Sequence, residues 1–565
     1  MRYIFRCLVT NRSKSFVFKQ SEILQHISSQ HATCRRFLQS STSGGVVFKS
    51  PRPTVEIPVV PLSDFLFSKF SGYGNKTALV DDTNATSYTY SQLEQLSRNV
   101  ASFLYRKGLR KNDVICYYGT NTPEFGVLLL ACSSAGIVLS TANPAYTTGE
   151  LERHMDHSGA TVLVTVPQLI PNAREANLKD VIVIGNSDGC QSFSNALADD
   201  GKCYPPDITI NPKEDVVLLP YSSGTTGLPK GVMLTHHNLV ANLLQFKECS
   251  SSFADDTNLA VLPFYHIYGV LVLLCDTLQS GGTLVTSPCF EPERYLKTLV
   301  EHKITQLHLV PPLAIFLARH PMVDKFDLSR IRSAFCGAAP LGETVTHEMK
   351  KKTNITIRQG YGLTETSPII SIDYLTDVTI GSVGPLVSNT EGKFIDVKTG
   401  ETLGRNETGE LCVRGPQNMK GYLKNEKATR EMIDDDGWLH TGDIGHMEDN
   451  DCIVITDRLK ELIKYKGRQV APAELEDLLH KHSAVQDVAV IGMPDDRAGE
   501  LPRAYVVLKP DISLHAHDIM KYVEENASDF KRLRGGVEFV KEIPKTPSGK
   551  ILRRLLRDQL SSLQQ

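Results

Sequence analysis

Short runs of apolar residues alternate with longer segments of helical periodicity along most of the chain from residue 54 onward. Residues 91–107 have apolar positions three and four apart, which predicts an amphipathic helix. Apolar, β-rich runs at 113–118, 161–166, 181–184, 216–219, 259–262, 307–310 and 333–336 predict strands. Because strands that alternate with helices form parallel sheets covered by helices, we predict an α/β fold with more than one sheet.

The pattern changes twice toward the C-terminal end. Between residues 384 and 413 the helical period fades and glycines separate short strands, which predicts an antiparallel or distorted barrel-like region. After the candidate linker at 457–460, a helix at 472–480 and a strand at 485–491 predict a small α+β domain. We therefore expect a large N-terminal domain over residues 51–457 and a small C-terminal domain over residues 458–565.

The composition is that of an ordinary globular protein. The chain has 565 residues, 61 Lys plus Arg against 64 Asp plus Glu, and 41% hydrophobic residues. This balance argues against a disordered protein and against nucleic-acid binding through a large basic field. No apolar stretch reaches the roughly 20 residues of a membrane helix. The twelve cysteines contain no Cys-x-x-Cys pair and no nearby His at metal-ligand spacing, which favours reduced thiols over a zinc site or a disulfide framework.

The first fifty residues differ from the rest of the chain. Eight Lys and Arg against one acid, Glu22, make residues 1–50 a segment of net charge +7, rich in Ser. This composition is typical of an organelle transit peptide and predicts import into the mitochondrial matrix, with cleavage near Arg35 and Arg36. A disordered leader on a cytoplasmic protein is the alternative. The last residues, Leu563, Gln564 and Gln565, do not form a peroxisomal signal.

A glycine-rich loop follows the strand predicted at 216–219. It reads Tyr-Ser-Ser-Gly-Thr-Thr-Gly-Leu-Pro-Lys-Gly over 221–231. Its glycines permit a tight loop with exposed backbone N–H groups, and its hydroxyls and Lys230 add donors, so the loop can wrap a polyphosphate. It is not a Walker A loop, because Lys230 follows Pro229. The candidate phosphate ligands are Ser222, Ser223, Gly224, Thr225, Thr226 and Lys230.

Three further stretches carry candidate chemistry. In Gln-Gly-Tyr-Gly-Leu-Thr-Glu-Thr-Ser, residues 359–367, Thr364 and Glu365 offer oxygens to Mg²⁺. In Trp-Leu-His-Thr-Gly-Asp, residues 438–443, the Asp443 carboxylate can accept two ribose hydroxyls, and Arg458 adds a contact. In the loop at 544–554, Lys550 can reach out to stabilise a developing negative charge.

Taken in order along the chain, these four stretches resemble those of the AMP-forming acyl-adenylate superfamily. Within it the chain looks most similar to 4-coumarate–CoA ligase-like enzymes, through Pro-Phe-Tyr-His-Ile-Tyr at 263–268, Gly-Ala-Ala-Pro-Leu-Gly at 337–342 and the segment 457–467. The resemblance covers residues 55–558. It implies α/β subdomains with a distorted β-barrel in the large domain and a small, mobile α+β C-terminal domain.

The resemblance implies an ATP-dependent acid–CoA ligase. A carboxylate, from a fatty or a hydroxycinnamate-like aromatic acid, attacks the α-phosphate of MgATP to give acyl-AMP, and the thiol of coenzyme A then displaces AMP. In the second half the C-terminal domain rotates about a hinge at Lys460. Small-molecule partners are implied, and neither a nucleic acid nor an oligomeric state is predicted.

The resemblance also implies residue roles. Lys550, Glu365 and Thr226 would be catalytic, and Thr226 with Glu365 would hold Mg²⁺. ATP and AMP would contact the loop named above together with Gln359, Gly360, Tyr361, Thr364, Asp443, Arg458, Lys460, Lys464 and Lys550. The acyl group would contact His266, Tyr268, Ala338 and Gly360, and coenzyme A would contact Lys466 and Gly467.

One departure and two alternatives accompany this reading. Cys289 stands where related ligases usually have a basic residue, so a contact to coenzyme A is missing or is supplied elsewhere. A luciferase-like oxygenase or a carrier-protein loader would share the adenylation half-reaction. A binding protein without turnover would require a broken catalytic position, whereas Lys230, Glu365, Asp443, Arg458 and Lys550 are all present.

Overall fold

The computed structural model describes residues 46–84, 86–205, 208–222, 229–250, 252–375, 378–466, 468–495, 497–546 and 549–563. Most of the predicted leader therefore lies outside the described residues. Within the described ranges, every helix is too short or too polar to span a bilayer.

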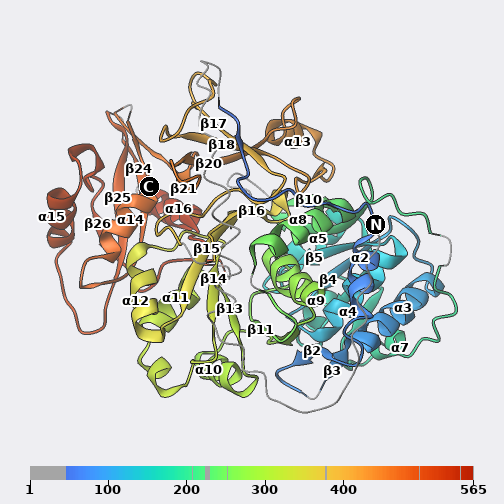
Figure 1. Cartoon of the computed structure of the whole chain (residues 1–565). Helices are drawn as coiled ribbons and strands as arrows, with labels where there is room; N and C mark the ends of the chain where they lie inside the picture. Colours follow the sequence, from blue (N-terminus) through green and yellow to red (C-terminus); the bar gives the residue numbers. More distant parts are fainter. Residues whose placement is uncertain are drawn as a thin grey trace, which may run out of the picture. The chain divides into compact units, whose positions relative to one another are not determined.

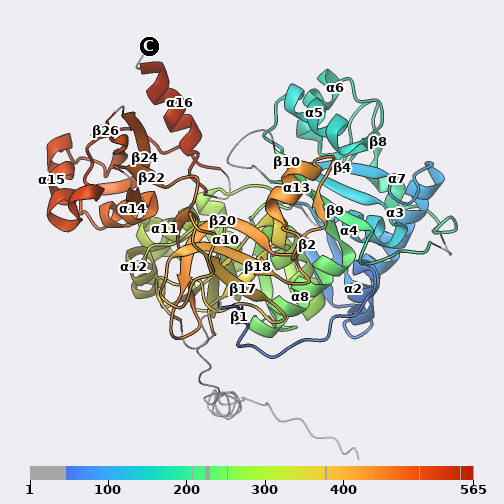
Figure 2. The same cartoon turned by 90° about the horizontal axis from the view of Figure 1, so that it is seen from above.

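The first of two eight-stranded sheets has the order β19-β10-β9-β5-β4-β6-β7-β8 and is parallel from β9 to β8. Its strands are β4 (Val114–Tyr118), β5 (Val138–Ala142), β6 (Ala160–Thr165), β7 (Val181–Val183), β8 (Gln191–Ser192), β9 (Val216–Ser222), β10 (Lys230–Thr235) and β19 (Gly421–Tyr422). The associated helices are α3 (Tyr90–Arg106), α4 (Pro123–Ala135), α5 (Thr148–Ser158), α6 (Ile170–Glu175) and α7 (Phe193–Leu197) (Figures 1 and 2).

Local sequence explains where these helices begin. The Thr89 side chain accepts a hydrogen bond from the Gln92 N–H, and the Gln92 side chain accepts one from the Thr89 N–H. These two bonds cap α3, which begins at Tyr90, one residue before the predicted start. Helix α4 is apolar on all sides because it is buried along almost its whole length.

The second eight-stranded sheet has the order β16-β15-β14-β13-β11-β12-β2-β3 and is parallel except at its two edges. Its strands are β2 (Thr77–Asp81), β3 (Ser87–Thr89), β11 (Thr257–Ala260), β12 (Thr283–Thr286), β13 (Gln306–Leu309), β14 (Ser333–Cys336), β15 (Thr356–Gly362) and β16 (Ile369–Ile372). The associated helices are α2 (Leu62–Phe70), α8 (His236–Cys249), α9 (Asp276–Ser280), α10 (Pro292–Glu301), α11 (Pro311–Arg319), α12 (Glu343–Thr353) and a π-helix at Tyr268–Cys275.

The barrel-like region is a wholly antiparallel five-stranded sheet of order β1-β17-β18-β20-β21. The short helix α13 (Glu426–Met432) precedes β20 along the chain. Its strands are β1 (Phe48–Lys49), β17 (Glu391–Ile395), β18 (Gly409–Arg414), β20 (Leu439–Met447) and β21 (Ile453–Arg458). Along β18, Leu411 and Val413 pack into an apolar cluster, so Glu410, Cys412 and Arg414 point to the opposite face.

The C-terminal segment forms its own mixed sheet with helices, as expected for a small α+β unit (Figure 2). Its strands are β22 (Ile463–Tyr465), β23 (Arg468–Val470), β24 (Val485–Asp495), β25 (Gly499–Leu508) and β26 (Val537–Phe539), and its helices are α14 (Pro472–His480), α15 (Ala516–Asn526) and α16 (Arg553–Leu563). Two apolar clusters, built only from residues beyond 462, fill its interior.

Candidate active site

The glycine-rich loop joins the two strands of an antiparallel hairpin. Ser222 ends β9 and Lys230 begins β10, and the two residues are paired across the hairpin. The loop itself, with Ser223, Gly224, Thr225 and Thr226, lies outside the described residues. At its base the Ser222 hydroxyl donates to Glu365 Oε1 at 2.9 Å, and the Lys230 ammonium lies 4.8 Å from the centre of the Tyr422 ring. The hairpin therefore brings Ser222, at the base of the predicted phosphate loop, into contact with Glu365.

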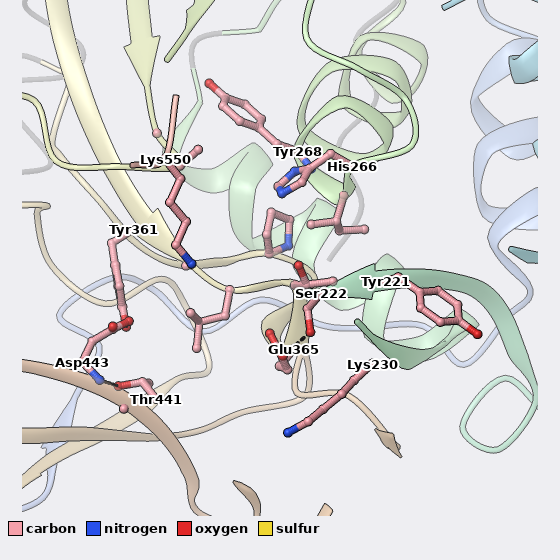
Figure 3. Close-up of a pocket in the computed structure, with 18 of the residues that line it drawn as sticks. Tyr221, Ser222, Lys230, His266, Tyr268, Tyr361, Glu365, Thr441, Asp443 and Lys550 are labelled. Carbon is pink, nitrogen blue, oxygen red and sulfur yellow. Dashed lines mark hydrogen bonds between the residues drawn. The ribbon is translucent and has the colours of Figure 1, made fainter. Parts of the chain in front are cut away.

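A tight turn after β15 orients Glu365. A Cβ on Gly362 would lie 1.7 Å from the Pro368 carbonyl oxygen, so only glycine permits the chain to fold back here. Glu365 Oε1 accepts a hydrogen bond from the Ser222 hydroxyl (Figure 3). It accepts a second one, at 2.7 Å, from the Tyr422 hydroxyl. Both bonds use the same oxygen, which fixes the carboxylate and leaves Oε2 as the ligand atom that suits a hard cation.

Asp443 lies on β20 directly opposite Arg458 on β21. Its Oδ2 accepts a 2.6 Å hydrogen bond from the Tyr361 hydroxyl, and its Oδ1 lies 3.2 Å from Arg458 Nε. Burial raises the pKa of the Asp443 carboxyl, while Arg458 and the Tyr361 hydroxyl lower it. The carboxylate is thus oriented by two partners, as a group that accepts ribose hydroxyls requires.

Lys550 reaches the same region from the C-terminal segment. Its backbone N–H donates to Thr546 Oγ1 at 3.0 Å, and a Cβ on Gly549 would lie 2.5 Å from Pro312 Cδ, so the loop lies close against α11. Burial, together with the charge of Arg458, lowers the pKa of the Lys550 ammonium to about 8. Lys550 is therefore charged at neutral pH and is only weakly solvated.

The segment 263–269 orients two predicted acyl contacts. A Cβ on Gly269 would lie 2.3 Å from the Pro263 carbonyl oxygen, so glycine permits the close turn that leads into the π-helix. His266 Nδ1 accepts from the Tyr268 N–H at 3.3 Å, and burial with the nearby Lys550 charge lowers the pKa of His266 to about 4. His266 is accordingly neutral and carries its proton on Nε2. The Tyr268 ring meets the Phe335 ring edge-on, with 5.8 Å between centroids.

These elements enclose a cavity of about 520 Å³. Most of the predicted site residues that the structure describes line it, among them His266, Asp443 and Lys550 (Figure 3). The predicted residues brought together here are Ser222, Lys230, His266, Tyr268, Ala338, Gly360, Tyr361, Thr364, Glu365, Asp443, Arg458, Lys460 and Lys550.

Sequence comparisons place the two parts of the chain in one family. Residues 66–423 match the model of the AMP-binding enzyme, and residues 474–550 match that of the AMP-binding enzyme C-terminal domain. The chain belongs to the AMP-binding enzyme family. A 4-coumarate–CoA ligase from Oryza sativa subsp. japonica is 41% identical over 91% of this chain and 98% of its own length. One from Arabidopsis thaliana is 39% identical over 93% of this chain and 97% of its own length.

Solved structures share the fold. ATP-bound MatB from Rhodopseudomonas palustris superposes with a TM-score of 0.82 at 28% identity, covering 90% of this chain and all of that chain. The anthranilate CoA ligase AuaEII in complex with anthranoyl-AMP gives a TM-score of 0.82 at 26% identity, covering 90% of this chain and 98% of its own. The predicted two-part α/β fold and the predicted enzyme class, an AMP-forming acid–thiol ligase, are confirmed.

Three predicted contacts lie away from the cavity in this structure. The Gln359 side chain accepts from the Leu341 N–H at 3.0 Å, so it supports the 337–341 loop. Lys464 lies on β22, where its N–H donates to Glu500 Oε2, and the Lys466 ammonium lies over the Tyr465 ring. Gly467 is outside the described residues. The predicted coenzyme A contacts therefore stay predictions.

Several residues of the site are not predicted from the sequence. Tyr422 orients Glu365, and Glu410 and His440 line the same cavity as Asp443. Tyr221 is the first residue of the predicted phosphate loop, and its hydroxyl lies 2.7 Å from His157 Nδ1, which ties the loop base to α5. Separate segments supply these partners, so no spacing along the chain signals them. His440 stands inside the Trp-Leu-His-Thr-Gly-Asp motif and was the one that could have been found.

Proposed function

We propose that this protein activates a hydroxycinnamate-like aromatic carboxylic acid with ATP and transfers the acyl group to coenzyme A. The observation that carries the proposal is that one cavity is lined both by the charged groups of Lys550 and Asp443 and by the apolar or aromatic side chains of Tyr268, Phe335 and Ala338. A flat, apolar ring packs well between aromatic side chains, and small residues leave room for it. The names of the 4-coumarate–CoA ligases and of the anthranilate CoA ligase support an aromatic acid.

In the first half-reaction two anions must meet. The Lys550 ammonium, poorly solvated by water, lies where it can bridge the substrate carboxylate and the α-phosphate, aligning them as the bond forms. Asp443, oriented by Tyr361 and Arg458, would accept the ribose hydroxyls. The neutral His266 offers its Nε2–H as a donor to the carboxylate of the acid.

The residues present also fit a magnesium ion. Glu365 has one oxygen held by Ser222 and Tyr422 and a second that suits a hard cation, and Thr226 of the phosphate loop would complete the protein ligands. When bound, the ion would neutralise phosphate charge. Ser222 and Lys230 would hold the β- and γ-phosphates from the base of the loop.

The test is ATP–pyrophosphate exchange with a panel of hydroxycinnamic, benzoic and short-, medium- and long-chain fatty acids, each repeated with coenzyme A and thioester detection. We expect exchange and thioester formation to be fastest with the hydroxycinnamic acids of the panel. Exchange without a thioester would favour a carrier-protein loader or an oxygenase, and preference for a fatty acid would overturn the aromatic assignment.

A matched pair of variants tests the mechanism. Lys550→Ala should lower acyl-AMP formation by about 10²–10³-fold while ATP binding is retained. Lys541→Ala, an exposed lysine of the same C-terminal segment, should leave the rate unchanged. An undiminished rate in Lys550→Ala would remove Lys550 from the reaction.

We also propose that residues 1–50 direct the protein to the mitochondrial matrix. Their net charge of +7 and their Ser-rich composition support this proposal. A reporter fused to residues 1–50 should enter mitochondria, and a cytosolic reporter would refute the proposal.

A further inference from the structure

Three side chains of metal-ligand type gather on one face of the antiparallel sheet. Glu410 and Cys412 are two residues apart on β18, so both point to the face opposite the apolar cluster of that sheet. His440 on β20 is paired directly with Cys412. One carboxylate, one thiol and one imidazole therefore converge, although 28 residues separate Cys412 from His440 along the chain.

The distances in this cluster suit hydrogen bonds poorly. Cys412 Sγ lies 3.5 Å and Glu410 Oε2 lies 3.4 Å from the same nitrogen, Nδ1 of His440. A ring nitrogen has one proton or one lone pair, so it cannot serve both neighbours well. A charged imidazole–carboxylate hydrogen bond is typically about 2.7–2.9 Å long, well below the distance seen here.

The same distances match the edges of a tetrahedral coordination shell. With Zn–S of about 2.3 Å and Zn–N and Zn–O of about 2.1 Å, ligand atoms of a tetrahedral site lie about 3.6 Å apart for S and N and about 3.4 Å apart for N and O. The ligand atoms of Glu410, Cys412 and His440 all lie within 4.8 Å of one another. A small rotation of the Glu410 or Cys412 side chain would close the third edge.

The other polar atoms of His440 and Glu410 face groups outside the cluster. His440 Nε2 lies 3.5 Å from Asp434 Oδ2, which is the arrangement of a metal-binding histidine whose other nitrogen faces a carboxylate. Glu410 Oε1 accepts from the Gly442 N–H at 3.0 Å, so Oε2 is the oxygen left for a cation. Asp434 and the Gly442 N–H thus orient the His440 imidazole and the Glu410 carboxylate from outside.

The charges around the cluster favour a cation. The carboxylates of Glu410 and Asp434 face the two nitrogens of the His440 ring, at 3.4 and 3.5 Å. Lys393, the cross-strand partner of Cys412, lies over the Trp438 ring at 4.6 Å from its centre. Arg414 lies over the same ring at 4.4 Å and is also paired with Glu391. Burial raises the pKa of the Cys412 thiol, and the charges of His440 and Lys393 lower it.

We propose that Glu410, Cys412 and His440 form a binding site for one thiophilic divalent cation, with Zn²⁺ the best match. Glu410 and His440 line the large cavity, with side chains that are 13% and 29% exposed, so the fourth coordination position faces the cavity and takes a water molecule. Binding requires the Cys412 thiolate and an unprotonated His440 Nδ1, so it releases protons. The ion would join β18 to β20 three residues before Asp443 on β20.

Co²⁺ is the probe because it substitutes for Zn²⁺ in tetrahedral sites and, unlike Zn²⁺, has absorption bands in the visible range. The full chain, freed of metal with a chelator, is titrated with Co²⁺ and then with Zn²⁺. We expect one equivalent of Co²⁺ to give tetrahedral d–d bands and a thiolate-to-cobalt charge-transfer band, and one equivalent of Zn²⁺ to abolish both. Zn²⁺ should also raise the Tm.

Variants locate the ion. Cys412→Ser should remove the charge-transfer band, His440→Gln should weaken binding by at least 100-fold, and Asp434→Asn, which removes only the outer carboxylate, by about 10–100-fold. Glu410→Gln provides a ligand variant that spares the buried core. Cys289→Ser is the matched control because Cys289 is an exposed thiol, and its titration should equal that of the wild type. A band that survives Cys412→Ser but is lost in Cys289→Ser, or no thiolate band at all, overturns the proposal.

Discussion

The charge state of Lys550 gives the sharpest prediction. Burial and the charge of Arg458 lower the pKa of its ammonium to about 8, compared with 10.5 for a solvated lysine. Acyl-AMP formation needs the protonated side chain, since the neutral amine cannot bridge two anions. The rate should therefore fall as the pH rises through about 8, whereas an ordinary lysine would stay charged beyond pH 10.

The magnitude follows from the titration. With a pKa of about 8, roughly half of Lys550 is charged at pH 8, about one tenth at pH 9 and about 3% at pH 9.5. The kcat/KM for ATP reports the ionisation of the free enzyme, so it should fall about tenfold for each pH unit above 8.5. In Lys550→Arg the guanidinium stays charged throughout this range. That variant should be slower at its maximum and should lack the alkaline decline.

The assay is acyl-AMP formation without coenzyme A, from pH 7.5 to 9.5. Cinnamate is the substrate, because it carries no phenol and no thiol is present to titrate. A wild-type profile that is flat to pH 9.5 would contradict the charge assignment. An equal alkaline decline in Lys550→Arg would show that another group titrates.

Three further variants test the charge of Lys550 and two hydrogen bonds of the site. Lys550→Met should raise the Tm by about 1–3 °C while it abolishes adenylation. Because the pKa of Lys550 is lower in the folded than in the unfolded protein, the charged lysine lowers the free energy of unfolding by at most about 3 kcal/mol below pH 8. This destabilisation disappears as the pH rises from 8 to 10.5. A lower Tm at pH 7 would contradict this. Tyr422→Phe removes the 2.7 Å hydrogen bond to Glu365 and should slow exchange about 5–30-fold with an unchanged Tm, and an unchanged rate would show that Ser222 alone orients Glu365. Tyr361→Phe should raise the KM for ATP about tenfold with little change in kcat, because Asp443 loses its 2.6 Å donor; a loss in kcat alone would place Tyr361 in the chemical step.

Local pattern was enough for most of the fold. The helix predicted at 91–107 is α3, and the strands predicted at 113–118 and 333–336 are β4 and β14 within a residue at each end. These elements follow from the period of apolar positions and from caps such as Thr89, both of which are local properties. The positions of the strands along the chain do not reveal the order of strands in the sheet, because β4 pairs with β5 and β6 through contacts that depend on the whole domain.

The sequence by itself determined the family, the two-part α/β architecture and the main candidates of the site, because Ser222, Lys230, Glu365, Asp443 and Lys550 stand in contiguous motifs whose residue types carry the chemistry. The tertiary structure decided which groups act on one another. Tyr422 meets Glu365, Tyr361 meets Asp443, and Cys412 meets His440 across strands that are distant along the chain. Charge state was decided there as well, since the pKa of Lys550 depends on burial and on neighbours that only folding brings together.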